Sequence, residues 1–182
     1  MRSEPIFVCS APWNRRRPNK LVIACSDGRL QENLDDFLLG HLGIRHYDRL
    51  YAPGGPGALA TSGIEFSRSD VFRRECLFLV AAHGVEDIYL IFHGPANDGP
   101  AEAVCADYSR IFPRYTPEQI RAEQTKDLAE ILNAGFGFQR PVRVHAYRCE
   151  VAGDGSVQFV ALREAPSPAV TAGPEPRRVL SP

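Results

Sequence analysis

The apolar positions of the chain follow two patterns, short continuous runs and longer stretches with helical spacing. Each run is rich in branched or aromatic residues, which is typical of strands buried on both faces. The runs predict strands at Leu21–Ala24, Ile88–Phe92 and Pro141–Arg148, with a weaker candidate at Tyr47–Tyr51. Helical spacing predicts helices over Gln31–Leu42, Thr61–His83, Pro100–Phe112 and from Thr116 up to Gly135.

This alternation of strands and helices predicts an α/β fold with a mainly parallel central sheet and flanking helices. The turn Gly153–Gly155 followed by the apolar run Val157–Leu162 predicts a C-terminal antiparallel hairpin strand. We assign residues 20–163 to this domain. Residues 1–19, with three prolines, predict an irregular N-terminal arm, and residues 164–182, rich in proline and small residues, predict a disordered tail.

Composition narrows the class of protein. A length of 182 residues suits one domain, and a formal net charge of -1 gives no electrostatic basis for nucleic-acid binding. No apolar stretch is long enough to span a bilayer, and residues 1–13 lack the pattern of a secretory signal. Five cysteines without framework spacing predict reduced thiols, and we therefore expect a cytoplasmic protein without membrane partners.

Two predicted strand-to-helix turns are dense in chemically active groups. Cys25, Asp27 and Arg29 follow the first strand, and His93 begins the turn after the strand Ile88–Phe92. If these strands are neighbours in a parallel sheet, the thiol and the imidazole meet at its carboxyl edge. Thiolate and imidazole are preferred ligands of zinc. Asp27 would then lie close enough to act on an activated water, and Arg29 would hold Asp27 through a bidentate pair.

Simpler structural explanations exist for the same residues. Cys25 can act as a small buried apolar residue, and Asp27 can be a helix cap paired with Arg29. His93 can be a core histidine whose ring nitrogens are hydrogen-bonded within the protein. Gly54 and Gly55 allow close approach of backbone N–H groups to a ligand, and on that basis we place them in a substrate pocket. The alternative is that these two glycines form a purely structural turn.

Several segments together resemble the β-class carbonic anhydrases. Cys25–Arg29 looks like the Cys-x-Asp-x-Arg motif of that family, and Ala52–Gly55 is similar to its Ala-Gly turn. Ile64–Phe66 looks like the start of the family's long helix. Gly84–Ile88, followed by a buried strand and His93, resembles the segment that carries the histidine ligand. The resemblance spans about Lys20 to Phe112 and implies a fold like that of β-carbonic anhydrases.

The sequence departs from the family at the third zinc ligand. The family's second motif is His-x-x-Cys-Gly, whereas Ala96 stands three positions after His93. Cys105 falls inside the predicted helix Pro100–Phe112, and we expect it to point away from the site. Asp98 precedes Gly99 and is the tentative third ligand beside Cys25 and His93. Asp98 can equally be the cap of the following helix.

The resemblance implies zinc-dependent, reversible hydration of carbon dioxide to bicarbonate. Cys25, His93 and tentatively Asp98 would hold zinc, Asp27 would orient the attacking hydroxide, and Arg29 would fix Asp27. It also implies a homodimer or higher homo-oligomer. Two alternatives remain open: a metal-free, catalytically inactive relative that binds an anion or serves in assembly, and a metal-free enzyme with Cys25 as nucleophile.

Overall fold

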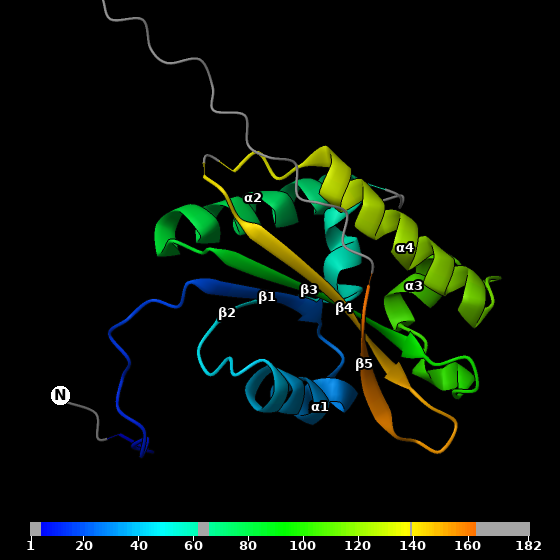
Figure 1. The fold of residues 1–182 in the computed structure, drawn as a ribbon, viewed down its shortest axis with the longest axis horizontal. Coiled ribbons are helices and arrows are strands. Elements are labelled where there is room, and N and C mark those ends of the chain that lie inside the picture. Colours follow the sequence, from blue (N-terminus) through cyan, green and yellow to red (C-terminus); the bar gives the residue numbers. More distant parts are fainter. Residues whose placement is uncertain (1–4, 62–65, 139, 163–182) are drawn as a thin grey trace, which may run out of the picture.

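A five-stranded sheet forms the centre of the molecule in a computed structural model that describes residues 5–61, 66–138 and 140–162 (Figure 1). The strand order is β2-β1-β3-β4-β5. The first four strands are mutually parallel and β5 is antiparallel to β4, so the predicted sheet and its final hairpin strand are confirmed. The strands are β1 (Lys20–Cys25), β2 (Asp48–Ala52), β3 (Asp87–Pro95), β4 (Arg143–Val151) and β5 (Val157–Ala161).

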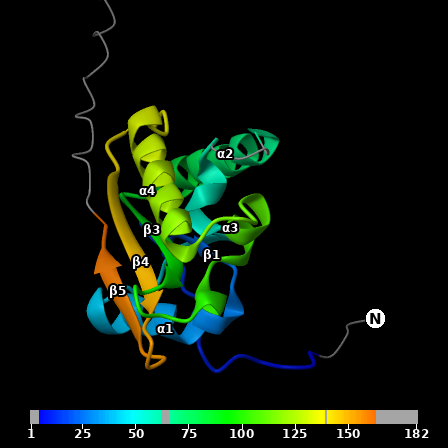
Figure 2. The ribbon, with the colours of Figure 1, turned by 90° about the vertical axis from the view of Figure 1, so that its right-hand side faces the viewer.

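Helices cover both faces of this sheet, as Figures 1 and 2 show. One face carries α1 (Gln31–Asp36), which continues as a π-helical turn, η2 (Phe37–His41). The other face carries α2 (Phe66–His83), α3 (Ala106–Ile111) and α4 (Pro117–Ala134). Three short 3-10 helices complete the fold: η1 (Gly28–Leu30), η3 (Gly55–Leu59) and η4 (Ala101–Ala103).

Two apolar cores result, one on each face of the sheet. Alternate residues of each strand point to opposite faces. Leu21, Ile23 and Leu90 therefore pack toward α2 and α4. Val22 and Ile91 pack toward α1. All nine residues of β3 are buried, as expected for a central parallel strand with helices on both faces.

The predicted helix Pro100–Phe112 is wrong as a single element. The helix η4 ends at Ala103, the next two residues are not helical, and α3 begins only at Ala106. Val104 and Cys105 have ψ angles of 140° and 119°, which are incompatible with a continuous helix. The interruption changes the direction of the Cys105 side chain, with consequences for the site described below.

Helix α4 begins as its sequence predicts. The Thr116 side chain accepts a hydrogen bond from the backbone N–H of Gln119, and the Gln119 side chain accepts one from the backbone N–H of Thr116. This capping box satisfies two N–H groups at the start of the helix. The buried residues Gln124 and Leu128 of α4 face the sheet.

The segment before the sheet has no regular secondary structure over residues 5–19. It contacts the domain through Arg17, which donates to the backbone carbonyl of Ala82 at 2.6 Å, and through Asn19. The predicted tail, residues 164–182, lies outside the described residues, as do Ile64 and Glu65 of the predicted long helix. Within the described residues, every helix is too short or too polar to cross a membrane.

Candidate functional site

The carboxyl ends of β1 and β3 bring Cys25 and His93 together. The two strands are adjacent and parallel, with Ala24 in register with Ile91. Cys25 is the last residue of β1, and His93 lies near the end of β3. A ligand atom of each lies within 4.8 Å of the other, and each also lies within that distance of the Cys105 sulfur.

Cys105 is the residue that sequence reasoning placed wrongly. Its Sγ lies 3.9 Å from Sγ of Cys25. The non-helical link between η4 and α3 turns Cys105 inward, so that it is only 1% exposed. The stretch Ala101–Cys105 consists mostly of good helix formers, and nothing in it signals a break. The only sequence signal was that a further cysteine follows His93 within the next predicted element.

His93 has the environment of a metal ligand. Its side chain is 3% exposed, and neither ring nitrogen is hydrogen-bonded to any described residue. Buried imidazole nitrogens normally have a partner, so these two require one. Gln124 donates to the backbone carbonyl of His93 at 3.0 Å, which fixes the backbone and leaves the ring nitrogens available. Two sulfurs and one imidazole nitrogen fit a zinc ion with a fourth position left for another ligand.

The contact between the two thiols shifts their pKa values in opposite directions. The pKa of Cys25 is lowered to about 4, mainly because Cys105 donates a hydrogen bond to its thiolate and also because His93 is near. The pKa of Cys105 is raised well above its ordinary value by the same contact and by burial. The contact therefore favours ionisation of Cys25 over Cys105, and the thiolate is the form of cysteine that binds metals.

Asp27 and Arg29 form a close ion pair beside Cys25. The Arg29 side chain donates to Oδ1 of Asp27 at 3.0 Å and to Oδ2 at 2.6 Å. This guanidinium lowers the pKa of Asp27 to about 2, so the carboxylate is ionised throughout the physiological range. Asp27 also accepts the backbone N–H of Arg29 as the cap of η1, so the cap and the ion pair expected from the sequence are both present. Arg29 further donates to the backbone carbonyl of Glu102 in η4, at 3.1 Å.

A cavity of about 190 Å³ opens beside these groups. Cys25 and Asp27 form one part of its wall. The rest includes residues that sequence reasoning did not assign to the site: Leu30 of η1, Leu34 of α1, and Arg49 and Tyr51 of β2. The parallel pairing of β2 with β1 brings Tyr51 beside Ala24 and explains its place in the wall.

The predicted pocket glycines lie behind the site rather than on the cavity wall. A Cβ atom on Gly55, whose φ is +56°, would lie 2.7 Å from the backbone nitrogen of Cys25. A Cβ atom on Gly54 would lie 2.5 Å from a carboxylate oxygen of Asp107. Both glycines are buried, and their contacts are those of the structural turn.

Asp98, the tentative third ligand, lies in an exposed turn beside Gly153. It is not part of the group formed by Cys25, His93 and Cys105.

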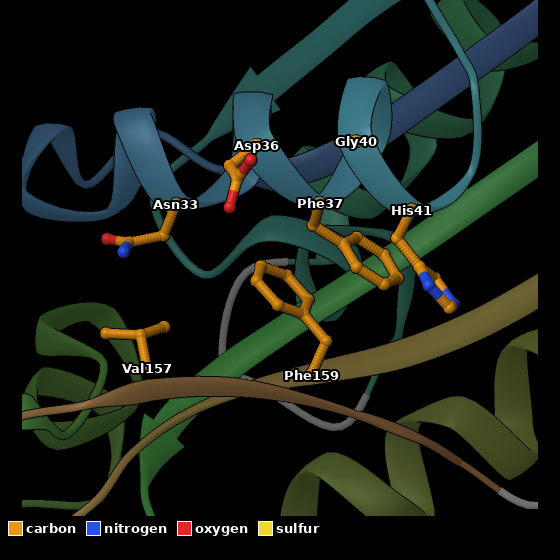
Figure 3. A pocket seen from close by; sticks show the side chains of 7 residues that line it. All are labelled: Asn33, Asp36, Phe37, Gly40, His41, Val157 and Phe159. Carbon is orange, nitrogen blue, oxygen red and sulfur yellow. The ribbon is translucent and has the colours of Figure 1, made fainter.

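A second hollow, of about 510 Å³, lies between α1, η2 and β5 (Figure 3). Phe37 and Phe159 stack at its base with ring centroids 4.0 Å apart. Its polar rim includes Asn33, Asp36 and His41. No predicted site residue lines this groove within the described part of the chain.

Comparison with known proteins gives the following matches. The solved structures similar to this chain include β-carbonic anhydrase isoform I from Trichomonas vaginalis, with 13% identity, a TM-score of 0.44 and coverage of 83% of this chain and 87% of that one. A carbonic anhydrase from Streptococcus mutans has 18% identity and a TM-score of 0.45, covering 80% and 82%. The β-carbonic anhydrase CafA of Aspergillus fumigatus has 17% identity and a TM-score of 0.44, covering 82% and 78%. No family model and no curated protein matches the sequence.

Proposed function

We propose that this protein is a zinc-dependent carbonic anhydrase of the β class, which interconverts carbon dioxide and bicarbonate. The observation that carries the proposal is the grouping of Cys25, His93 and Cys105 within 4.8 Å, next to the Asp27–Arg29 pair. Cys25 and His93 are two of the three ligands expected from the sequence. Cys105 supplies a sulfur in place of the cysteine that is missing three positions after His93.

Zinc would be held by the sulfurs of Cys25 and Cys105 and by a ring nitrogen of His93. When bound, the ion supplies Lewis-acid activation of water near neutral pH. The alternative of a metal-free, catalytically inactive relative rested on the lack of a third sulfur ligand. The sulfur of Cys105, 3.9 Å from that of Cys25, supports the zinc-binding proposal over that alternative.

Asp27 orients the water that attacks carbon dioxide. Because its pKa is lowered to about 2, the carboxylate accepts a hydrogen bond and does not donate one. Three N–H groups of Arg29 contact the carboxylate: the backbone N–H, the Nε–H, which both oxygens share, and one Nη2–H. An ionised carboxylate has about four acceptor positions, so one is left for an O–H donor. Arg29 keeps the carboxylate aimed at the cavity through its three side-chain contacts.

The cavity suits a small substrate. Its volume of about 190 Å³ is below that of most drug-sized ligand sites, which begin near about 300 Å³. Leu30, Leu34 and the Tyr51 ring give it apolar wall surface next to Asp27. Carbon dioxide is small and apolar, and such a wall accepts it without a hydrogen bond.

Stopped-flow hydration of carbon dioxide by zinc-loaded protein tests the activity. We expect His93→Ala to lower kcat/KM by more than about a hundredfold, because a first ligand matters at least as much as its supporting residues. The matched control is His41→Ala, which removes an exposed histidine from the other groove and leaves the rate unchanged. Zinc-loaded wild-type protein that hydrates carbon dioxide no faster than buffer would contradict the proposal.

We also propose that two copies associate through the N-terminal arm. Ile6, Phe7 and Trp13 are 105%, 78% and 83% exposed, so the arm presents large apolar side chains that no described residue covers. Exposed apolar groups gathered in one segment indicate an interaction surface. Deletion of residues 1–13 is expected to convert a dimer into a monomer in light scattering, and a monomeric full-length chain would contradict the assignment.

A further inference from the structure

The two cysteines of the site are close enough to react with each other. Their sulfurs are 3.9 Å apart, whereas Cys76 and Cys149 lie in the two apolar cores. We propose that Cys25 and Cys105 form a reversible disulfide when peroxide reaches the metal-free protein, and that this bond abolishes zinc binding. The inference rests on the proposed function for its second half, because it treats the same sulfurs as zinc ligands.

Peroxide can reach only one of the two sulfurs directly. Cys25 lines the cavity beside Asp27 and is partly exposed, whereas Cys105 is 1% exposed. The oxidant therefore meets Cys25 first, and Cys105 is placed behind it as the second thiol. A partly exposed thiol with a second cysteine next to it is the usual arrangement of cysteines that respond to oxidation.

The reaction balances in two steps with hydrogen peroxide as the named oxidant. The Cys25 thiolate attacks one peroxide oxygen, the O–O bond breaks, and the products are a sulfenic acid and hydroxide. The Cys105 sulfur then attacks the Cys25 sulfur and displaces the sulfenic oxygen, which leaves as water with the thiol proton. One thiolate and one thiol lose two electrons in total, and one peroxide becomes one hydroxide and one water; the hydroxide takes a proton from the solvent.

The fold allows the sulfurs of Cys25 and Cys105 to approach each other. A disulfide requires a separation of about 2.0 Å, so the sulfurs must approach by about 1.9 Å. Cys25 is held at the end of β1, where the backbone N–H of Ser26 donates to the carbonyl of Ala52 at 3.0 Å. Cys105 lies in the non-helical link between η4 and α3, so it is the partner that adjusts.

The consequence for zinc follows from ligand chemistry. Metals bind the thiolate form of cysteine, and a disulfide sulfur has no such charge. Oxidation would remove two of the three proposed ligands and leave only His93. A dithiol reductant would restore both thiols by exchange.

The experiment uses full-length protein with Cys9→Ser, which removes the exposed cysteine of the arm and with it intermolecular disulfides. Metal-free protein is treated with hydrogen peroxide, and its intact mass and peptide map are measured before and after dithiothreitol. We expect a loss of about 2 Da, a peptide joining Cys25 to Cys105, and recovery on reduction. Zinc uptake, measured separately with a colorimetric chelator, should fall by about tenfold or more after oxidation.

Matched variants identify the pair. Cys105→Ser should give no linked peptide and should instead carry added oxygen on Cys25, because the resolving thiol is missing. Cys76→Ser, which removes a core cysteine, should form the linked peptide as the parent does. The peptide map of the parent protein decides the question even where a variant fails to fold.

The outcomes separate this inference from the proposed function. Reduced protein that binds zinc but gives no Cys25–Cys105 peptide overturns the inference and leaves the proposed function intact. A Cys25–Cys105 peptide from protein whose reduced form binds no zinc supports the dithiol pair and overturns the zinc assignment. A linked peptide with undiminished zinc uptake overturns the claim that the disulfide excludes the metal.

Discussion

At the residue scale, two interactions with Arg29 hold Asp27 in place, and the sequence predicts both of them. Its carboxylate accepts the backbone N–H of Arg29 at 3.1 Å, which caps η1, and it accepts the Arg29 side chain as well. A cap fixes the carboxylate at the end of a strand-to-helix turn, and an ion pair fixes its charge. Both interactions hold Asp27 in place on the wall of the cavity beside Cys25.

Replacing Asp27 by asparagine should separate catalysis from metal binding. Asn also caps helices, so the fold and the zinc content should be kept. Loss of the charged acceptor should lower the rate of carbon dioxide hydration by about a hundredfold, as for other positioned acid–base groups. Stopped-flow kinetics with zinc analysis of the same sample measures both quantities.

The control for this prediction is Asp35→Asn. Asp35 lines the same cavity but accepts a hydrogen bond from the Tyr47 hydroxyl, away from the proposed ligands. Equal losses of activity in both variants would show that Asp27 has no special part in the reaction.

At the scale of elements, the turn after β2 supports the site from behind. The backbone of Gly55 packs against that of Cys25, with no space for a Cβ atom, and its φ of +56° favours glycine. The turn thereby sets the position of the last residue of β1. A change in this turn should alter both the stability of the fold and the position of Cys25.

Gly55→Ala should lower the free energy of unfolding by about 3 kcal/mol, because overpacking and backbone strain each cost about 1–3 kcal/mol. Gly28→Ala is the matched control, since a Cβ atom there meets no atom within 4 Å. It should change stability by less than about 0.5 kcal/mol. Urea unfolding followed by circular dichroism measures both, and equal stabilities of the two variants would refute the packing argument.

The elements also show what a single sequence can predict. The apolar runs predicted β1 and β3 because buried parallel strands have a strong pattern. Their adjacency was a condition of the site hypothesis, and the pairing of β1 with β3 meets it. The break at Val104 and Cys105 was missed because it depends on tertiary contacts, including the hydrogen bond from Arg29 to Glu102. The part of the cavity wall that β2 supplies was missed for a similar reason, because no local sequence pattern determines which strands are neighbours.

At the scale of the whole molecule, a charge cluster joins three strands at the edge opposite the site. Asp87 at the start of β3 pairs with Lys20 of β1 at 3.4 Å and with Arg143 of β4 at 2.7 Å, and His145 lies 3.0 Å away. The Asp87 side chain is only 4% exposed. The hydrogen bonds from Arg143 are the main reason that the pKa of Asp87 is lowered well below its ordinary value.

The stability contributed by Asp87 should therefore depend on pH. A carboxylate whose pKa is lowered by folding stabilises the protein fully above its unfolded pKa, about 3.9, and loses this effect as pH falls below that value. Asp87→Asn should cost about 3 kcal/mol at pH 7, as for a broken buried pair, and progressively less in acid. Asp70→Asn, an exposed aspartate of α2, is the control. A cost that is constant from pH 7 down to pH 2 would contradict this account.

The zinc content of the purified protein tests the central claim most directly. Protein made without a histidine tag and with added zinc should contain about one zinc per chain, as should Asp98→Asn, whereas Cys105→Ser should contain less than about a tenth. Mass spectrometry of the metal gives these values on one set of samples. Wild-type protein with less than about a tenth of an equivalent of zinc, or a loss of zinc in Asp98→Asn with retention in Cys105→Ser, would contradict the Cys25–His93–Cys105 site.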